Sequence, residues 1–180
     1  GKGMQFALPA AVATGDGVAY VASVVWNGES DSLRLFADGG EGFEKVVTLV
    51  EEGIVHEPAL TRDRDGRLWC AWGATGEDET VDLMVRSWHP NEGPGEVAIL
   101  SDTDAAEAFV DAGVDSEGRV WMAWQSFRNG QADVLARFLD PGTGEWSAEI
   151  VVADTPGGEW EPDLAFDGDG HAWGLYDRAR

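Results

Sequence analysis

The sequence predicts an all-β protein built from β-propeller blades, and three observations lead to that prediction. A turn motif recurs four times and ends each time in an aromatic residue, and these aromatic residues lie 49, 52 and 52 positions apart. A fixed period of about 50 residues with several short strands in each period is typical of propellers. Glycine also interrupts the apolar runs, and the apolar spacing of an α-helix is not sustained.

The four copies of the motif place glycines and aromatic residues at corresponding positions. They read TGDGVAY at 14–20, DRDGRLW at 63–69, DSEGRVW at 115–121 and DGDGHAW at 167–173. An Asp side chain accepts hydrogen bonds from nearby backbone, and Gly adopts a positive φ without strain. We therefore interpret the motif as the turn between the first two strands of a blade. The residues that define this structural repeat are Gly17, Gly66, Gly118, Gly170, Tyr20, Trp69, Trp121 and Trp173.

Around these turns the chain divides into three complete four-stranded blades and one hairpin. Blade 1, about 6–52, has strand candidates at 9–13, 18–25, 32–36 and 43–50. Blade 2, about 56–102, has them at 58–62, 68–72, 81–88 and 96–100. Blade 3, about 107–153, has them at 110–114, 120–124, 132–138 and 146–152. A partial blade 4, about 160–180, supplies only 162–166 and 172–176.

The second strand of each blade is apolar at nearly every position, as in LWCAW at 68–72. Such a strand is covered on both faces, which a blade achieves by lying between two others. We therefore expect the tryptophans at the repeat positions to pack in the core: Trp69, Trp72, Trp121, Trp124 and Trp173. Trp26, Trp88 and Trp160 lie near strand ends and are freer to contact a ligand.

Three and a half blades do not close a ring, since propellers have four to eight blades. We favour the interpretation that residues 1–180 form one segment of a larger propeller. A ring built from two or more copies of the chain and a self-closed ring with one thin blade remain alternatives. If the chain is a segment, the rest of the propeller would complete the ring. If the ring is built from several copies, the other copies of the chain would complete it.

Composition excludes some partners. The net charge of −22 repels nucleic acid and anionic lipid, and no stretch approaches 18 uncharged apolar residues. We expect neither a nucleic-acid partner nor a membrane span. The single cysteine, Cys70, sits in an apolar run and is expected to be buried rather than catalytic.

Cofactors are not expected. The acidic turns resemble fragments of calcium loops, but one such turn has too few oxygens for the six to eight that calcium prefers. No zinc spacing, phosphate loop or nucleophile elbow is present. We interpret the acidic turns as structural and keep calcium as a weaker alternative.

The repeats resemble those of bacterial secreted propellers of the sialidase-like and TolB-like kind. The resemblance lies in the pattern of Pro, the Asp-x-Asp-Gly turn, Trp-x-Ala-Trp, Asp-x-x-x-Arg and Trp-Ser, over most of the chain. It implies a fold and an exported location, secreted or periplasmic. In the sialidase Asp-box the Asp lies two residues before Gly, whereas Asp63, Asp115 and Asp167 lie three before it. Sialidase activity is therefore not carried over.

In propellers of this kind, ligands meet the face formed by the connections between blades and between the second and third strands, or the central channel. The residues there combine acids, an aromatic ring and a cation, and the blades are not identical at these positions. They are our candidate ligand-binding set: His56, Glu57, Arg128, Trp160 and Glu161. Asp111 and Asp163 occupy equivalent positions that would line the channel. We expect a non-catalytic binding or scaffold module for a carbohydrate or peptide. The alternatives are part of a propeller-scaffold glycoside hydrolase or lyase, and an engineered or fragmented propeller that assembles into a ring.

Overall fold

The computed structural model describes residues 4–15, 17–101, 103–169 and 171–178, and its strands form separate antiparallel sheets. The first sheet, blade 1, is β1 (Gln5–Ala13), β2 (Ala19–Trp26), β3 (Asp31–Asp38) and β4 (Glu44–Gly53), in that order. Blade 2 is β5 (Ala59–Arg62), β6 (Leu68–Thr75), β7 (Val81–His89) and β8 (Gly93–Ser101).

Blade 3 is β9 (Glu107–Val114), β10 (Val120–Ser126), β11 (Asp133–Leu139) and β12 (Ile150–Ala153), with the short 3₁₀ helix η1 (Arg128–Gly130) before β11. Blade 4 is the hairpin of β13 (Glu159–Phe166) and β14 (Ala172–Arg178). The predicted fold class, with three four-stranded blades and a final hairpin, is confirmed. Within the described residues no helix is long and apolar enough to span a membrane.

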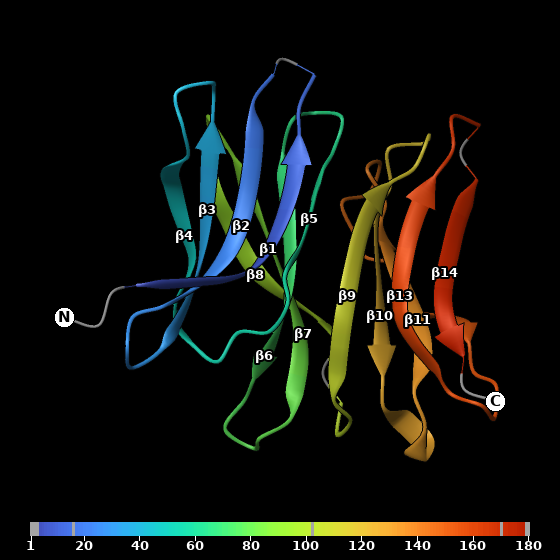
Figure 1. Ribbon diagram of the computed structural model, residues 1–180. Helices are drawn as coiled ribbons and strands as arrows, with labels where there is room; N and C mark the ends of the chain where they lie inside the picture. The colour runs from blue at the N-terminus through green and yellow to red at the C-terminus, as the bar shows by residue number, and fades with distance from the viewer. Residues whose placement is uncertain (1–3, 16, 102, 170, 179–180) are drawn as a thin grey trace.

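The sheets follow one another side by side in chain order, as Figure 1 shows from the blue strands to the red ones. The first strands of consecutive blades are in contact: β1 with β5, β5 with β9, and β9 with β13. These four strands therefore line the inner side of the array, where the axis of a propeller would run.

The hydrophobic core lies between the sheets. One cluster fills the space between blades 1 and 2 and includes Leu33, Leu35 and Trp72. A second fills the space between blades 2 and 3 and includes Leu83, Met122 and Trp124. Blade 2 is thus covered on both faces, as its two-sided apolar second strand predicts.

The turns between the first and second strands explain why Asp lies three residues before Gly. In blade 3, Asp115 Oδ1 accepts hydrogen bonds from the backbone N–H of Glu117 and Arg119, both at 2.9 Å. Its Oδ2 accepts one from the indole N–H of Trp121 at 2.9 Å. Asp63 and Asp167 make the corresponding bonds to Trp69 and Trp173. The motif therefore joins the turn to the aromatic residue of the next strand.

The glycines of these turns have the backbone that the motif requires. Gly17, Gly66 and Gly118 have φ of 88°, 89° and 84°. Gly170 and Arg180 lie outside the described residues. Blade 1 carries Thr14 in place of Asp and Tyr20 in place of Trp, and the Thr14 hydroxyl donates to Val18 O at 2.8 Å. The blade 1 motif thus lacks both partners of the indole–carboxylate hydrogen bond, because Tyr20 has no indole N–H and Thr14 has no carboxylate.

Trp173 corrects one sequence-based expectation. We expected it in the core with its counterparts, but its side chain is 60% exposed. In the described chain, β14 has no sheet packed on its far side and no third strand beside it. The repeat position alone therefore does not bury an aromatic residue, because burial also needs a neighbouring blade.

The strand ends differ from the expected ones in several places, among them the starts of three first strands and of one fourth strand. The first strands of blades 1, 3 and 4 begin three or four residues early, because a bulge joins a short leading segment to the rest of the strand. The fourth strand of blade 3 begins at Ile150 instead of Trp146, which makes only an isolated bridge to Leu139.

Candidate functional site

An open hollow of about 450 Å³ lies on the inner side of the array, where blades 2, 3 and 4 meet. Its lining comes from the segment before β5 and from the bulged starts of β9 and β13. The residues that line it are Glu57, Phe109, Val110, Asp111, Glu161, Pro162 and Asp163. We call it the acidic hollow, because four of these seven residues carry carboxylates. Phe109 supplies an aromatic ring beside these carboxylates.

Asp111 and Asp163 form the electrostatic centre of the hollow. Burial raises the pKa of Asp111, and a hydrogen bond and charge repulsion from Asp163 raise it further. Hydrogen bonds from the backbone, including the 2.7 Å bond from Leu164 N to Asp111 Oδ2, act against the rise without cancelling it. A carboxyl group beside a second carboxyl group in this setting keeps its proton to higher pH than usual.

The backbone of the hollow is strained at two positions. Phe109 and Glu161 both have φ of 51°, a conformation that side chains other than glycine's rarely adopt. Leu8 has φ of 49° at the corresponding place in blade 1. The fully buried Gln125 supports the bulge in blade 4, because its Oε1 accepts the Glu161 N–H at 3.0 Å. The bulge belongs to the blade design, while the side chain that it presents differs from blade to blade.

Of the predicted site residues, the structure brings Glu57 and Glu161 together in the acidic hollow. Trp160 lies next to them, in a hollow of about 420 Å³ that it shares with Glu161, Asp177 and Arg178. The indole ring of Trp160 packs edge-on against Phe127, with ring centroids 5.6 Å apart. Asp111 and Asp163, expected at equivalent positions along the channel, line the acidic hollow.

His56 points elsewhere. Its Nε2 lies 2.8 Å from Thr75 Oγ1, and its backbone N–H donates to Gly73 O at 2.9 Å. The ring packs closely over Gly73, so that a Cβ there would lie 3.2 Å from the His56 Cβ. Within the described chain His56 therefore ties the start of blade 2 to β6, and it is not among the residues that line the acidic hollow.

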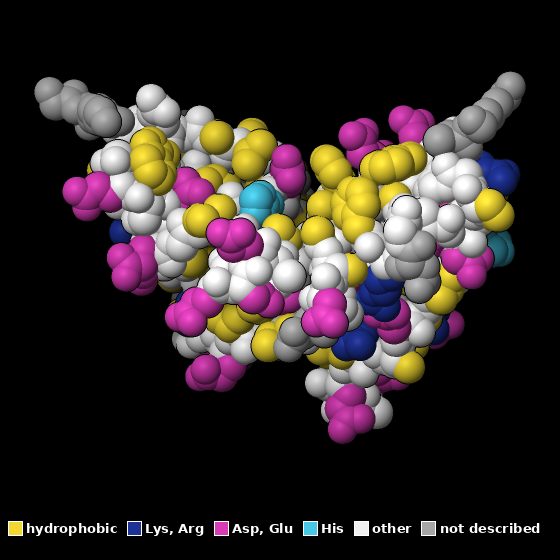
Figure 2. All heavy atoms as spheres, turned by 90° about the horizontal axis from the view of Figure 1, so that it is seen from below, with side chains coloured by type: hydrophobic (Ala, Val, Ile, Leu, Met, Phe, Trp, Pro, Cys, Tyr) yellow, Lys and Arg dark blue, Asp and Glu magenta, His cyan; other side chains and the backbone are white. Residues whose placement is uncertain are grey.

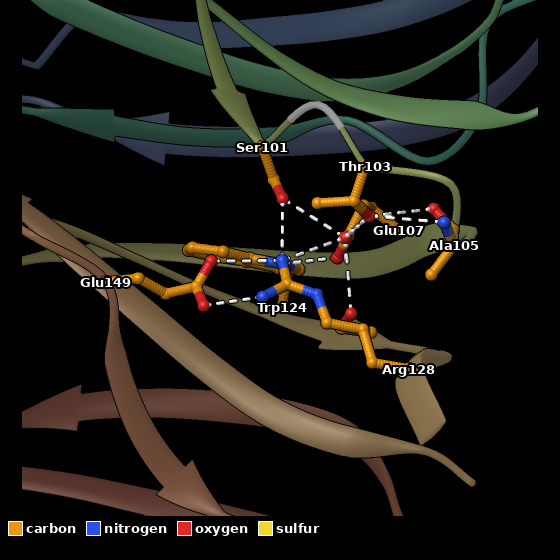
Figure 3. A network of polar contacts seen from close by, with 8 residues as sticks. Ser101, Thr103, Ala105, Glu107, Trp124, Arg128 and Glu149 are labelled. Atoms are coloured by element: carbon orange, nitrogen blue, oxygen red, sulfur yellow. Dashed lines mark hydrogen bonds and ion pairs between the residues drawn. The ribbon is translucent and has the colours of Figure 1, made fainter. Parts of the chain in front are cut away.

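Arg128 belongs to a separate polar network between blades 2 and 3 (Figure 3). Its guanidinium pairs with Glu107 at 3.1 Å and, through both terminal nitrogens, with Glu149 at 2.5 and 3.0 Å. Glu107 is fully buried and accepts further bonds from Ser101, Thr103, Ser126 and the Trp124 indole N–H. These ion pairs raise the pKa of Arg128, with the Glu149 hydrogen bond as the largest cause. Its contacts are those of a residue that joins blades.

Sequence reasoning missed the buried glutamates and did not select Phe109. Glu107 and Glu159 are 52 residues apart, the spacing of the repeat, and each is fully buried next to a threonine, Thr103 or Thr155. That internal match was available in the sequence. Phe109 stands where blades 2 and 4 have Glu57 and Glu161, and an aromatic residue in place of these acids was the only sequence signal.

The described part of the structure offers no reactive thiol and no metal cluster. Cys70 is buried, and burial raises the pKa of its thiol to about 12. Among the described residues, no three His, Cys, Asp or Glu side chains lie close enough to hold a metal ion. The calcium alternative at the acidic turns stays a hypothesis. What the acidic hollow can do chemically is accept hydrogen bonds, stack an apolar surface on Phe109, and donate a proton from Asp111.

The sequence matches no known protein family and no curated protein. Solved structures do resemble the fold. A protein of unknown function from Dyadobacter fermentans has a TM-score of 0.71 at 12% identity, over 97% of this chain and 57% of that one. An endo-arabinase from Bacteroides thetaiotaomicron has 0.65 at 14% identity, over 96% and 70%. A Hadza microbial sialidase has 0.64 at 12% identity, over 88% and 39%.

These similarities confirm the resemblance to sialidase-like propellers at the level of the fold. The chain spans 57% of the Dyadobacter protein and 39% of the sialidase. At such low identity the likeness concerns architecture, and function rests on the site itself.

Proposed function

We propose that this chain is a carbohydrate-binding module whose site is the acidic hollow and that it binds without turnover. The observation that carries the proposal is the meeting of four carboxylates and one aromatic ring in a single open hollow. Carboxylates accept hydrogen bonds from sugar hydroxyls, and an aromatic face packs against the apolar face of a sugar ring. Binding sites of this kind combine an apolar wall with a few placed polar groups.

The charge of the hollow favours a neutral glycan over an anionic one. Glu57, Glu161 and Asp163 are exposed carboxylates, and no Arg or Lys lines the hollow in the described chain. An acidic sugar would meet like charge there without a cation to pair with it. Carbohydrate is favoured over a basic peptide because carbohydrate-active enzymes stand among the structures that share this fold. We further propose an exported protein, secreted or periplasmic, because such ligands are met outside the cytoplasm.

One observation favours hydrolysis as the second candidate. The raised pKa of Asp111 lets its carboxyl group keep a proton to higher pH, as the general acid of a glycosidase does. In that case Asp111 would protonate the leaving oxygen of a glycosidic bond, and a neighbouring carboxylate would act on the opposite face of the sugar.

The test compares binding and turnover in one preparation. Isothermal titration and a glycan array would measure binding of neutral arabino- and xylo-oligosaccharides, sialylated glycans and basic peptides. We expect Glu57→Gln and Phe109→Ala each to weaken binding of a neutral glycan by about tenfold, which corresponds to the loss of one good contact. Trp160→Ala should weaken it less, because Trp160 lies in the neighbouring hollow.

The control is Glu117→Gln, which removes an exposed carboxylate on a turn far along the strand from the hollow. It should leave binding unchanged. Reducing sugar released by the wild type and lost in Asp111→Asn would replace the binding module with the hydrolase. Binding that survives both hollow variants, or binding of peptides alone, would contradict a carbohydrate site in the acidic hollow.

A further inference from the structure

Two sheet faces at the ends of the array expose large apolar side chains. On the face of blade 1 that is turned away from blade 2, Phe6 and Phe43 are exposed. On the face of blade 4 that is turned away from blade 3, Trp173 and Leu175 are exposed, Leu175 at 71%. Figure 2 shows hydrophobic side chains gathered along one edge of the molecule, on both sides of a central notch. We call the face of blade 1 that is turned away from blade 2 the blade 1 outer face, and the face of blade 4 that is turned away from blade 3 the blade 4 outer face.

The interfaces inside the chain follow a rule that the two outer faces reverse. On the second strand, Ala22 of blade 1 shares a core cluster with Trp72 of blade 2. Ala71 of blade 2 likewise shares one with Trp124 of blade 3. A small residue on one blade thus meets a large one on the next. At the corresponding positions blade 4 has Leu175 in place of Ala, and blade 1 has Ser23 in place of Trp. The large residue, Leu175, is therefore on the blade that would carry the small one, and the small residue, Ser23, is on the blade that would carry the large one.

This exchange leaves a hollow on blade 1 and a projection on blade 4. The hollow on the blade 1 outer face measures about 430 Å³ and is lined by Phe6, Ala7, Pro9, Val21, Ser23, Phe36 and Phe43. The Ser23 hydroxyl donates to Ala7 O at 2.9 Å, so the one polar side chain of the lining is satisfied. An apolar hollow whose polar group is already paired suits an apolar side chain such as that of Leu175.

The aromatic contacts between blades point to the same pairing. Trp69 of blade 2 packs edge-on against Trp146 of blade 3, with ring centroids 6.1 Å apart. The residue of blade 4 that corresponds to Trp69 is Trp173, and the residue of blade 1 that corresponds to Trp146 is Phe43. Both are exposed. An aromatic pair that the chain uses internally is therefore available, one half on each outer face.

The charges on the two faces are also complementary. Val24 of blade 1 belongs to the first core cluster, and the partly buried Met84 of blade 2 packs against that cluster. The corresponding residues on the outer faces are Asp177 of blade 4 and Arg34 of blade 1. Arg34 contacts Ser32 Oγ and Met4 Sδ and has no carboxylate partner among the described residues. An apolar pair inside the chain is thus replaced by an acid on one outer face and a base on the other.

We propose that two copies of this chain form a two-fold symmetric ring, in which the blade 4 outer face of each copy packs on the blade 1 outer face of the other. The two contacts are equivalent, so the assembly closes and exposes neither face. Leu175 enters the hollow beside Ser23, Trp173 packs on Phe43, and Asp177 pairs with Arg34. Each copy supplies three complete blades and one hairpin to the ring.

The first experiment measures the mass of the 180-residue chain in solution by light scattering and sedimentation at several concentrations. We expect a particle of twice 19.3 kDa that dissociates on dilution. A chain that stays monomeric with its β-structure intact would overturn the proposal, and would assign the outer faces to further blades of a longer polypeptide. A series of larger particles would overturn it too, because the contact would then be open instead of closed.

The second experiment exchanges the charges. Arg34→Asp and Asp177→Arg should each weaken the dimer by about tenfold or more, because each places like charges opposite one another. The double variant Arg34→Asp/Asp177→Arg should restore the dimer. A residue that matters only for folding would not be rescued in this way, so failure of the rescue would overturn the pairing.

The third experiment tests the apolar fit. Leu175→Ser should weaken the dimer, since it removes the projection that fills the blade 1 hollow. Val151→Ser is the matched control, because Val151 is an exposed apolar residue on β12, away from both outer faces. An equal effect of the two substitutions would contradict the proposed contact. Circular dichroism of every variant verifies that the blades remain folded.

Discussion

Trp121 and Trp173 occupy the same position of the repeat and differ in almost everything around them. Each donates its indole N–H to an Asp six residues earlier, at 2.9 Å in blade 3 and 3.2 Å in blade 4. Trp121 is half-buried against Phe138 of its own sheet and Phe166 of the next. Trp173 is 60% exposed.

The difference teaches that the repeat encodes two things separately. The turn and its hydrogen bond to the indole are local, so they form in every blade that carries the Asp and the Trp. Burial of the ring is not local, because it depends on a sheet that lies about fifty residues away in the chain. The same motif therefore contributes much stability inside the array and little at its end.

The largest expected effect on stability comes from replacing Trp121 and Trp173, one at a time, by alanine. Trp121→Ala should lower the free energy of unfolding by about 3–5 kcal/mol, as large-to-small changes in a core do. Trp173→Ala should lower it by less than about 1 kcal/mol in the isolated chain, because most of its ring already contacts water. Urea unfolding followed by circular dichroism measures both. Equal losses would mean that the two rings share one environment in solution, as they would in a closed dimer at high concentration.

The next effect concerns the Asp beneath each ring. Burial opposes the charged form of Asp115, yet hydrogen bonds from Trp121 and Arg119 hold its pKa below the ordinary value. Asp115→Ala should therefore cost about 1.5–3 kcal/mol, the range for hydrogen bonds to a charged group. In blade 4 backbone bonds, chiefly from His171, lower the pKa of Asp167 to about 2.

Asp167→Ala should cost less than Asp115→Ala, because Asp167 is more exposed and water replaces its lost partners. The same urea titration compares the two variants at neutral pH. A larger loss for Asp167 than for Asp115 would contradict the view that the internal turns are the stronger ones.

A smaller effect tests the junction of blades 3 and 4 through pH. Because the pKa of Asp111 is raised, the folded state holds a proton that the unfolded state has already released above the ordinary value of 3.8. Its contribution to stability is full below that value and is lost as pH rises through the raised pKa. The wild type should therefore lose stability relative to Asp111→Asn as the pH rises above about 3.8 and through the raised pKa of Asp111. Parallel stability curves would show that Asp111 titrates normally.

The smallest expected effect is that of salt, which should leave the difference between the Trp121 and Trp173 variants unchanged. A net charge of −22 repels itself, so molar sodium chloride should raise the melting temperature by about 2–4 °C for each ~1 kcal/mol of screened repulsion. Screening acts on the whole surface, and the difference between Trp121→Ala and Trp173→Ala should persist in salt. If millimolar calcium alone produced the full rise, the acidic turns would be calcium ligands.

For the candidate site, the sequence predicted part of the lining and missed the rest for a physical reason. Glu57 and Glu161 follow from one repeat position, so their shared location could be predicted. Arg128 looked equally available, but Glu107 and Glu149 hold its guanidinium from positions 21 residues away on either side. Such pairing depends on which side chains meet across a sheet, and a linear spacing does not contain it.

The sequence by itself determined the propeller blades, their strand order and the chemistry of their turns, because all three depend on a local motif and a constant period. Only the tertiary structure decided which repeat positions are buried, which carboxylates share the acidic hollow, and which faces lack a partner. Those properties arise from contacts between blades, where the free energy of burying an apolar side chain depends on what the neighbouring sheet presents. Leu175 and Ser23 illustrate the point, since neither is unusual in the sequence until the alignment of the blades places them against Ala and Trp.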